Sequence, residues 1–365
     1  MSEVISILLD LLRIKSVTAH EDEIKKYIVH KVKDRLFFSE VRNNIVCFSS
    51  ESCYFALVGH IDTVDNINLK NGIVEDGKVF GLGASDMKAG IAIMLYLLQR
   101  FNHLPILWIF YDREEGSYND NGLSLVFDKF RNILKNLKFA IILEPTSNNI
   151  ELGCNGVINY GLWIKGKSGH SARPQTYQNP FYLSLPIVDF IANYKPVDYI
   201  HEISINSRNH KLCFTGNMVI TQIKGYIDKT NENNFKNLVP EYCFINVNVR
   251  YTPNYNFEDF DKSFRNKMLG YKCDIEIIDH APAGKILINR ELVEFLEWYL
   301  KNGDFEIHGK QAWTDVARFS LFNIPAINLG PGEPSQAHQK NEYAFISKIE
   351  QLSIILARYL QQLRS

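Results

Sequence analysis

The sequence predicts an α/β protein with a mostly parallel sheet, helices on both faces of that sheet, and a smaller ferredoxin-like α+β domain inserted into it. Two observations predict the sheet: apolar strand-like runs alternate with helical patterns, and several of the runs end directly at His, Asp or Glu. A third observation predicts the insertion, because the element order changes to β-α-β-β-α-β after about Gly156.

The first part of the chain begins with two helical patterns, at Glu3 to Arg13 and at Glu21 to Leu36, where apolar residues recur every three or four positions. Apolar runs that end beside polar or charged residues follow. We predict strands at Tyr54–Val58, Pro105–Tyr111 and Phe139–Leu143 and a helix at Met87–Phe101. In open parallel sheets, sites form beyond the carboxyl ends of the strands, so the polar residues at these ends are the first candidates.

The inserted domain is predicted from four strands and two helices. The strands are Asn159–Gly166, Met218–Tyr226, Tyr242–Tyr251 and Cys273–Ile278, and the helices are Pro180–Tyr194 and Phe257–Met268. The last stretch, Asn289 to Leu363, returns to helix–strand–helix character. We therefore expect residues 1–156 and 282–365 to form a catalytic α/β domain, and residues 157–281 to form a small α+β domain inserted in it.

Composition narrows the class of protein. Of 365 residues, 46% are hydrophobic and 22% are charged, which excludes a wholly disordered chain. The 40 basic and 41 acidic residues give a net charge of −1, which argues against a general nucleic-acid binder. The most apolar stretch, Gly90–Leu98, is about half the ~20 residues of a membrane span, and no signal peptide is recognisable. Six scattered cysteines without a C-x-x-C pair are typical of reduced thiols, so we expect a cytoplasmic protein.

His60 and Asp62 lie at the end of the first predicted strand. A period of two places both side chains on one side, so the carboxylate can reach the imidazole or a metal beside it. The alternative is a strand-end pair exposed by chance. Asp86 follows a Gly-rich loop that fails the dinucleotide-binding pattern, because a carboxylate stands where the third glycine is needed. Asp86 is therefore either a helix N-cap or a metal ligand.

Glu114 and Glu115 follow a strongly apolar strand. In a regular strand they would point to opposite faces, so a turn must redirect at least one of them. The pair is either a solvated acidic loop or a general base beside a metal ligand. Glu144 ends another buried strand before Pro145, as a capping acid or as a ligand.

His338 lies in a Pro/Gly-rich loop, and His170 lies in the inserted domain, far in sequence from the other candidates. Each alone is typical of a solvated surface histidine. Together, the histidines and carboxylates at strand and loop ends suit a catalytic zinc site without Cys, and a shared carboxylate allows two metals ~3.5–4 Å apart. The chain contains no H-E-x-x-H or G-x-S-x-G motif to support a competing chemistry.

Six motifs then occur in one order along the chain. They are Gly59-His-Ile-Asp-Thr-Val64, Gly83-Ala-Ser-Asp-Met-Lys88, Glu114-Glu115, Glu144-Pro-Thr146, Gly169-His-Ser-Ala-Arg-Pro174 and His338. In this order they resemble the M20 family of di-zinc peptidases and deacylases, over nearly the whole chain. Within it, the chain is most similar to members that hydrolyse N-succinyl-LL-2,6-diaminopimelate, particularly the branch typical of actinobacteria. That closer similarity rests on Tyr111–Glu115 with Asn121–Leu123, on Glu151–Gly156, on Trp313–Phe319 and on Ile324–Pro334.

The resemblance implies a role for each matching residue. His60, Asp86 and Glu144 would hold one zinc, and Asp86, Glu115 and His338 would hold the other, with Asp86 shared. Asp62 would orient His60, and Glu114 would be the general base that takes a proton from the attacking water. Residues 157–281 would be the family's lid and dimerisation domain, and from it His170 would reach a neighbouring subunit's site and stabilise the oxyanion. Arg250, Asn237 and Thr314 would bind substrate.

The chain departs from the family pattern at two places, and the residues there would contact the acyl end of the substrate. The proteobacterial branch has an arginine where this chain has Cys154, and a Gly-Thr-Ser turn where this chain has Ala312-Trp-Thr314.

The implied reaction is hydrolysis of an N-succinyl amide in lysine and diaminopimelate biosynthesis. The implied cofactors are two zinc ions per subunit, or cobalt in their place, and the implied assembly is a homodimer without nucleic-acid or membrane partners. The alternatives are another deacylase or carboxypeptidase of the family, such as an acetylornithine deacetylase, and a non-enzymatic binding protein on the same scaffold.

Overall fold

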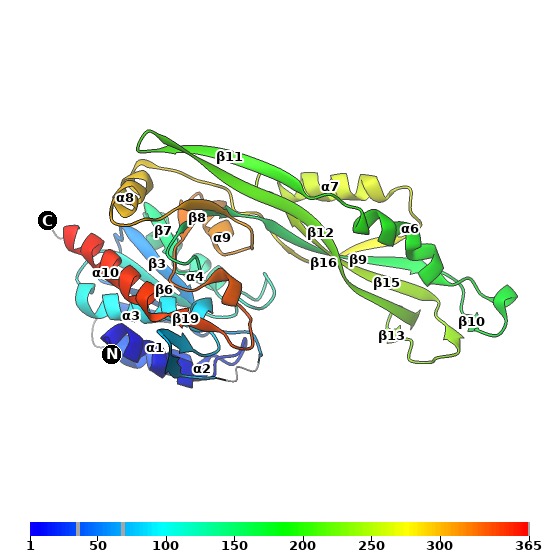
Figure 1. Ribbon diagram of the computed structural model, residues 1–365, viewed down its shortest axis with the longest axis horizontal. Coiled ribbons are helices and arrows are strands. Elements are labelled where there is room, and N and C mark those ends of the chain that lie inside the picture. Colours follow the sequence, from blue (N-terminus) through cyan, green and yellow to red (C-terminus); the bar gives the residue numbers. More distant parts are fainter. Residues whose placement is uncertain (34–36, 67–69, 364–365) are drawn as a thin grey trace.

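The computed structural model describes residues 1–33, 37–66 and 70–363. Figure 1 shows an elongated molecule, in which a large α/β body carries both termini and a β-rich body extends away from it. The described part of the chain contains no helix that is both long and apolar enough to cross a membrane.

An eight-stranded sheet forms the centre of the large body. Its strands, in spatial order, are β1 (Phe37–Val41), β2 (Asn44–Phe48), β6 (Ile106–Tyr111), β3 (Phe55–His60), β7 (Phe139–Ile142), β18 (Ala326–Asn328), β8 (Ile150–Cys154) and β17 (Ile307–Lys310). The β6–β3–β7–β18 core is parallel, and so is the β8–β17 pair. The antiparallel pairs are β1–β2, β2–β6 and β18–β8. The carboxyl ends of β3, β6 and β7 therefore meet at one edge of the sheet.

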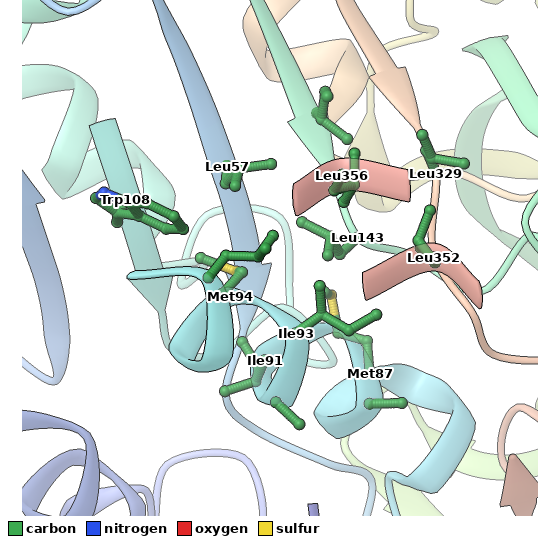
Figure 2. Close-up of a cluster of buried hydrophobic side chains, with 14 of the residues drawn as sticks. Leu57, Met87, Ile91, Ile93, Met94, Trp108, Leu143, Leu329, Leu352 and Leu356 are labelled. Carbon is green, nitrogen blue, oxygen red and sulfur yellow. The ribbon is translucent and has the colours of Figure 1, made fainter. Parts of the chain in front are cut away.

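Helices cover both faces of this sheet, as the sequence predicts. On one face lie α1 (Glu3–Arg13), α2 (Asp22–Val32), α3 (Ala89–Phe101), α8 (Arg290–Lys301) and α10 (Ile346–Gln362). On the other lie α4 (Leu123–Lys129), α5 (Arg131–Leu134) and α9 (Val316–Leu321). In Figure 2, Met94 of α3 lies on the side of Leu57, and Leu352 and Leu356 of α10 lie beside Leu143 and Leu329. The end of the second predicted helix, Leu36, lies outside the described residues.

A small three-stranded sheet lies beside the loop that contains Asp86. It consists of β4 (Ile73–Glu75), β5 (Lys78–Phe80) and β19 (Tyr343–Phe345). Short helical turns precede α3 and His338, at η1 (Ala84–Lys88) and η3 (Pro334–Gln336).

The β-rich body is a second sheet with the order β11-β12-β15-β9-β16. Its elements along the chain are β9 (Gly156–Lys165), α6 (Pro180–Ala192), β11 (Val197–Ile205), β12 (Arg208–Asp228), β15 (Tyr242–Tyr251), α7 (Phe257–Met268) and β16 (Asp274–Ala281). The expected β-α-β-β-α-β order is present. It is extended by β11, by a much longer β12 and by β13 (Asn231–Glu232), which pairs with the end of β12. At the tip, β10 (Gly169–His170) pairs with β14 (Leu238–Val239), and η2 (Pro174–Thr176) follows β10.

Among the described residues, helices α6 and α7 cover one face of this second sheet. Buried residues of β9 and β15, such as Leu162 and Val247, form a core with Ile187 of α6 and Phe264 of α7. The ring of Phe264 stacks on Tyr160 at 4.0 Å between centroids. The residues that alternate with this set, among them Trp163, lie on the opposite face, which we call the open face of the inserted sheet.

The β11–β12 hairpin ties the two bodies together. Its residues Ile203, Leu212 and Phe214 belong to the same hydrophobic core as the helices of the large body. Phe214 packs closely over Gly309 of β17, where a Cβ atom would lie 2.8 Å from the ring. Gln311 donates a hydrogen bond from Nε2 to the Cys213 carbonyl oxygen at 2.7 Å. The inserted sheet is thus anchored in the large body by apolar packing as well as by its chain connections.

Candidate metal centre

His60 is the last residue of β3 and is almost completely buried, at 1% exposure. Its Nε2 lies 3.1 Å from Asp86 Oδ1 and 3.9 Å from Glu144 Oε1. Its Nδ1 lies 3.0 Å from the Asp62 carbonyl oxygen and 3.5 Å from the Asp62 carboxylate. The main-chain oxygen of Asp62 is therefore the nearer partner of the imidazole.

The Asp62 carboxylate instead holds the turn after β6. It accepts hydrogen bonds from the backbone N–H groups of Glu114 and Glu115, at 3.0 and 3.1 Å, and from Thr18 Oγ1 at 2.9 Å. Arg113, at φ +57°, turns the chain there. Burial opposes ionisation of Asp62, but hydrogen bonding and charge from His60 outweigh it and lower its pKa. One ionised aspartate thus fixes the backbone of both glutamates.

Asp86 does not cap a helix, which corrects one of the two interpretations of its loop. It lies within η1 at φ −120° and ψ 94°, the residue before α3 is Lys88, and the Asp86–Met87 peptide bond is cis. A buried carboxylate, Glu342, accepts the backbone N–H groups of Gly83, Ser85 and Asp86 at 2.8 to 2.9 Å. The loop is held by Glu342, and the Asp86 side chain remains available to the cluster.

His338 closes the cluster from the loop after η3. Its Nε2 lies 3.0 Å from Glu115 Oε1 and 3.7 Å from Asp86 Oδ2. Its backbone adopts φ +61°, a conformation that a non-glycine residue rarely occupies and that tends to occur at functional sites. Glu144 enters from the turn after β7, and its Oε1 is buried without a hydrogen-bond partner among the described residues.

Three groups of side chains in the described residues place ligand atoms within 4.8 Å of one another. They are His60 with Asp86 and Glu144, Asp86 with Glu115 and His338, and His60 with Glu114 and Glu115. The first two are the ligand sets that the resemblance implies, and Asp86 belongs to both. The structure therefore brings together all five predicted ligands, with Glu114 beside them.

The electrostatics of the cluster show an excess of negative charge. Burial, followed by the charge of Asp86, raises the pKa of Glu144 to about 8. Burial also raises the pKa of Glu114 well above its usual value, although His60 opposes the shift and the charges of Glu144 and Glu115 add to it. The hydrogen bond to Glu115 raises the pKa of His338 to about 9. Carboxyl groups so close together require protons or a cation between them.

A cavity of about 490 Å³ opens beside the cluster, between the two sheets. Asp86, Glu115 and His338 lie in its wall on the catalytic side, and Arg250 of β15 lies in the wall formed by the inserted sheet. Thr314 also contacts the cavity, and its hydroxyl is buried without a hydrogen-bond partner among the described residues. The predicted substrate-binding residues Arg250 and Thr314 thus share one cavity with the cluster.

The structure does not bring His170 and Asn237 to this cavity within one chain. Both are exposed at the tip of the inserted body, where the Ser171 N–H donates to the Asn237 carbonyl oxygen at 3.0 Å. In Figure 1 the β10 tip lies at the end of the β-rich body that points away from the large α/β body. The two residues are neighbours of each other and distant from their predicted site.

Two charged residues of the centre were not among the sequence candidates. Glu342 holds the Asp86 loop, and Lys310, at the end of β17, donates to the Pro145 carbonyl oxygen at 3.2 Å and pairs with Glu151 at 2.6 Å. Neither belongs to a spacing pattern. Lys310 is buried at the end of β17, where a lysine needs a partner, but its burial depends on the fold and is not marked in the sequence.

Comparisons with known proteins agree with this geometry. The model of peptidase family M20/M25/M40 matches residues 56–362. A succinyl-diaminopimelate desuccinylase of Corynebacterium glutamicum is 30% identical over 322 residues, covering 84% of this chain and 80% of the relative. One of Wolinella succinogenes is 30% identical over 310 residues, with 80% and 79% coverage.

Solved structures show the same fold at lower identity. The aminopeptidase PepT of Bacillus cereus superposes with a TM-score of 0.72 at 18% identity, over 100% of this chain and 98% of that one. The M20 metallo-carboxypeptidase Sso-CP2 of Sulfolobus solfataricus gives 0.74 at 17% identity, over 100% and 99%.

Proposed function

Because the chain belongs to peptidase family M20/M25/M40, we propose that it is a metal-dependent amide hydrolase that converts N-succinyl-LL-2,6-diaminopimelate and water to succinate and LL-2,6-diaminopimelate. The names of the curated relatives support this substrate. The observation that carries the proposal is the cavity in which the His/Asp/Glu cluster faces Arg250, because it joins hydrolytic groups to a receptor for a carboxylate.

The residues of the cluster fit zinc. All donors are imidazole nitrogens or carboxylate oxygens, and the Glu144 Oε1 atom has no other partner among the described residues. His60, Asp86 and Glu144 would hold one ion, and Asp86, Glu115 and His338 a second one. Bound there, zinc lowers the pKa of water toward ~7 and polarises the amide carbonyl.

Glu114 carries out the proton transfers. Its backbone is fixed by Asp62, and its carboxylate lies beside the ligands without belonging to either implied ligand set. Glu114 takes a proton from the water that attacks the amide carbon and delivers it to the nitrogen of the leaving amine. His60, Glu114 and Glu115 all contact Asp62, so Asp62 is a positioning residue for these three residues.

Glu342 positions Asp86, the ligand that belongs to both sets. We expect Glu342→Gln to weaken zinc binding about 10- to 100-fold, the usual cost of losing a hydrogen-bond partner behind a metal ligand. The reason is that the amide NH2 would face one of the three backbone N–H groups that the carboxylate now accepts. Calorimetric titration of the metal-free protein with Zn²⁺ measures this change. Glu350→Gln, on α10, is the matched control, and equal affinities in the two variants would contradict the role of Glu342.

Arg250 is proposed to bind a substrate carboxylate. Burial lowers the pKa of its guanidinium, and the described residues offer it neither an ion pair nor a hydrogen bond. Arg250→Lys retains the charge but loses the bidentate geometry, so we expect kcat/KM for the succinylated substrate to fall roughly 10- to 100-fold. Steady-state kinetics test this, with Arg265→Lys on α7 as the control. Unchanged kinetics in Arg250→Lys would remove it from the site.

We propose a homodimer because His170 and Asn237, at the tip of the inserted body, do not line the cavity of their own chain. Residues 217–225 of β12 pair with β15 along one edge, and no described strand pairs with the other edge. Exposed apolar side chains flank this edge, namely Tyr182 and Leu185 on α6 and Val219 and Ile223 on β12. A second copy paired here would cover them, and its tip would be free to reach a neighbouring cavity.

The substrate itself is tested with a panel. The zinc-loaded protein is offered N-succinyl-LL-2,6-diaminopimelate, N-acetylornithine and a dipeptide at equal concentrations. We expect the succinylated substrate to give the highest kcat/KM. Faster turnover of acetylornithine or the dipeptide would assign the protein to another activity of the family, and the absence of turnover with zinc bound would indicate a binding protein.

A further inference from the structure

The wall of the cavity on the side of the inserted sheet consists of two neighbouring rows of residues on its open face. One row crosses β15, β9 and β16 as Asn248, Asn159 and Asp279. The adjacent row consists of Arg250, Val157 and Ala281. All six residues contact the cavity. One row is therefore polar and ends in a carboxylate, and the other presents a guanidinium beside two small apolar side chains.

A β-bulge brings Asp279 onto this face. Ile277 pairs with Tyr160 on the helix-covered side, and the register shifts by one residue before Asp279 pairs with Asn159. Without the bulge, Ile278 would stand opposite Asn159 and Asp279 would point to the helices, since side chains alternate along a strand. Bulges beside active sites commonly redirect one side chain in this way.

Asp279 has no partner that explains a carboxylate in this position. The described residues offer it no ion pair and no hydrogen bond through its side chain, and its distance from Arg250 exceeds the limit of an ion pair. The cavity already contains the carboxylates of Asp86, Glu114 and Glu144. A further negative charge repels an anionic substrate unless it meets a positive group of that substrate.

We propose that Asp279 binds the free ammonium group of the leaving amine, so that this wall of the cavity recognises an α-amino-acid zwitterion. This inference rests on the proposed function, because it identifies the part of that substrate which the inserted sheet contacts. Asn248 donates to Asn159 Oδ1 at 2.9 Å, which leaves the Asn159 NH2 group as a donor for the carboxylate of the same zwitterion. Arg250 lies on the same side as a second donor.

The spacing of the rows suits such a ligand. Arg250 and Asp279 are separated by two strand spacings, about 9–10 Å, and by one row along the strands, about 7 Å. A long arginine side chain and a short aspartate can both reach one ligand between them, although they do not reach each other. A ligand with a carboxylate and an ammonium group on one carbon fits between these charges.

The test compares three succinyl amides that differ only at the far end. N-succinyl-LL-2,6-diaminopimelate has both groups, Nα-succinyl-L-lysine has the ammonium alone, and N-succinyl-L-2-aminopimelate has the carboxylate alone. We expect Asp279→Asn to lower kcat/KM roughly 10- to 100-fold for the first two, the effect of losing a charge-assisted hydrogen bond, and to leave the third within twofold. Asp274→Asn, on the same strand and face but outside the cavity, is the control.

The outcomes separate this inference from the proposed function. Unchanged kinetics of Asp279→Asn on the third substrate show that the variant folds and binds metal. An equal loss on all three substrates, or no loss on any, would overturn the role of Asp279 while the wild-type activity stands. If the wild type hydrolyses none of the three, the proposed function fails, and the assignment of Asp279 fails with it.

Discussion

Glu114→Gln is expected to lower kcat by about 10²–10⁴-fold, the range that general acid–base catalysis contributes, while the protein still binds zinc. The amide of glutamine cannot accept the proton of the attacking water, but it occupies the same volume. The two implied ligand sets do not include Glu114, and its backbone hydrogen bond to Asp62 does not involve the side chain. Turnover and metal content of the purified variant measure the two halves of this prediction.

Glu115→Gln is the matched control, since it makes the same change one residue along the chain. Glu115 lies 3.0 Å from His338 and belongs to the second ligand set. We expect this variant to lose part of its metal, and added zinc to restore part of its activity. Retention of more than about a tenth of the activity by Glu114→Gln would lie outside the range for a general base. It would then assign the role to another residue of the cluster.

His170→Ala is expected to lower kcat by about 10²-fold or more, with normal metal content. The reason is the loss of a ring N–H donor to the oxyanion that forms on the substrate carbonyl. Within one chain His170 is exposed at the tip, and its Nδ1 accepts the Ala172 N–H at 3.1 Å. In the proposed homodimer this donor would act on the site of the other subunit, as the family resemblance implies.

Mixed dimers separate this role from a structural one. A His170→Ala subunit retains Glu114, and a Glu114→Gln subunit retains His170, so their heterodimer contains one complete site. We expect activity to reappear on mixing, up to half that of the wild type per dimer. Differently tagged subunits allow the heterodimer to be purified and its composition checked. Verified heterodimers without recovered activity would contradict action across the dimer.

The ligands of the centre could be predicted because the sequence places them at strand ends. Buried strands end at His60 and just before Glu144, and parallel pairing brings these ends to one edge. The role of Glu342 could not be predicted in this way, since it reaches Gly83 across 259 positions through backbone N–H groups that no residue type marks. The role of Asp279 could not be predicted either. The face of the sheet on which Asp279 lies depends on a register shift of one residue, and the alternation of side chains along a strand does not reveal such a shift.

The length of β12 was also beyond the sequence pattern. The predicted strand, Met218–Tyr226, is the amphipathic half that packs against β15 and the helices. The other half, from Arg208, pairs with β11 and buries Leu212 and Phe214 in the core of the large body. The predicted strand begins only at Met218, because the burial of Leu212 and Phe214 depends on contacts with residues distant in sequence.

The continuous β12 strand constrains how the cavity between the two sheets can change its width. At about 3.4 Å per residue its 21 residues span about 70 Å, and they pass from one hydrophobic core to the other without a break. A change in the width of the cavity would therefore have to bend or twist this strand, and could not be a rotation of two rigid blocks about a loose connection. Excision of residues 157–281 would likewise remove Ile203, Leu212 and Phe214 from the core that remains. The one strand that is shared by both hydrophobic cores thus helps to set the distance between the His/Asp/Glu cluster and Arg250.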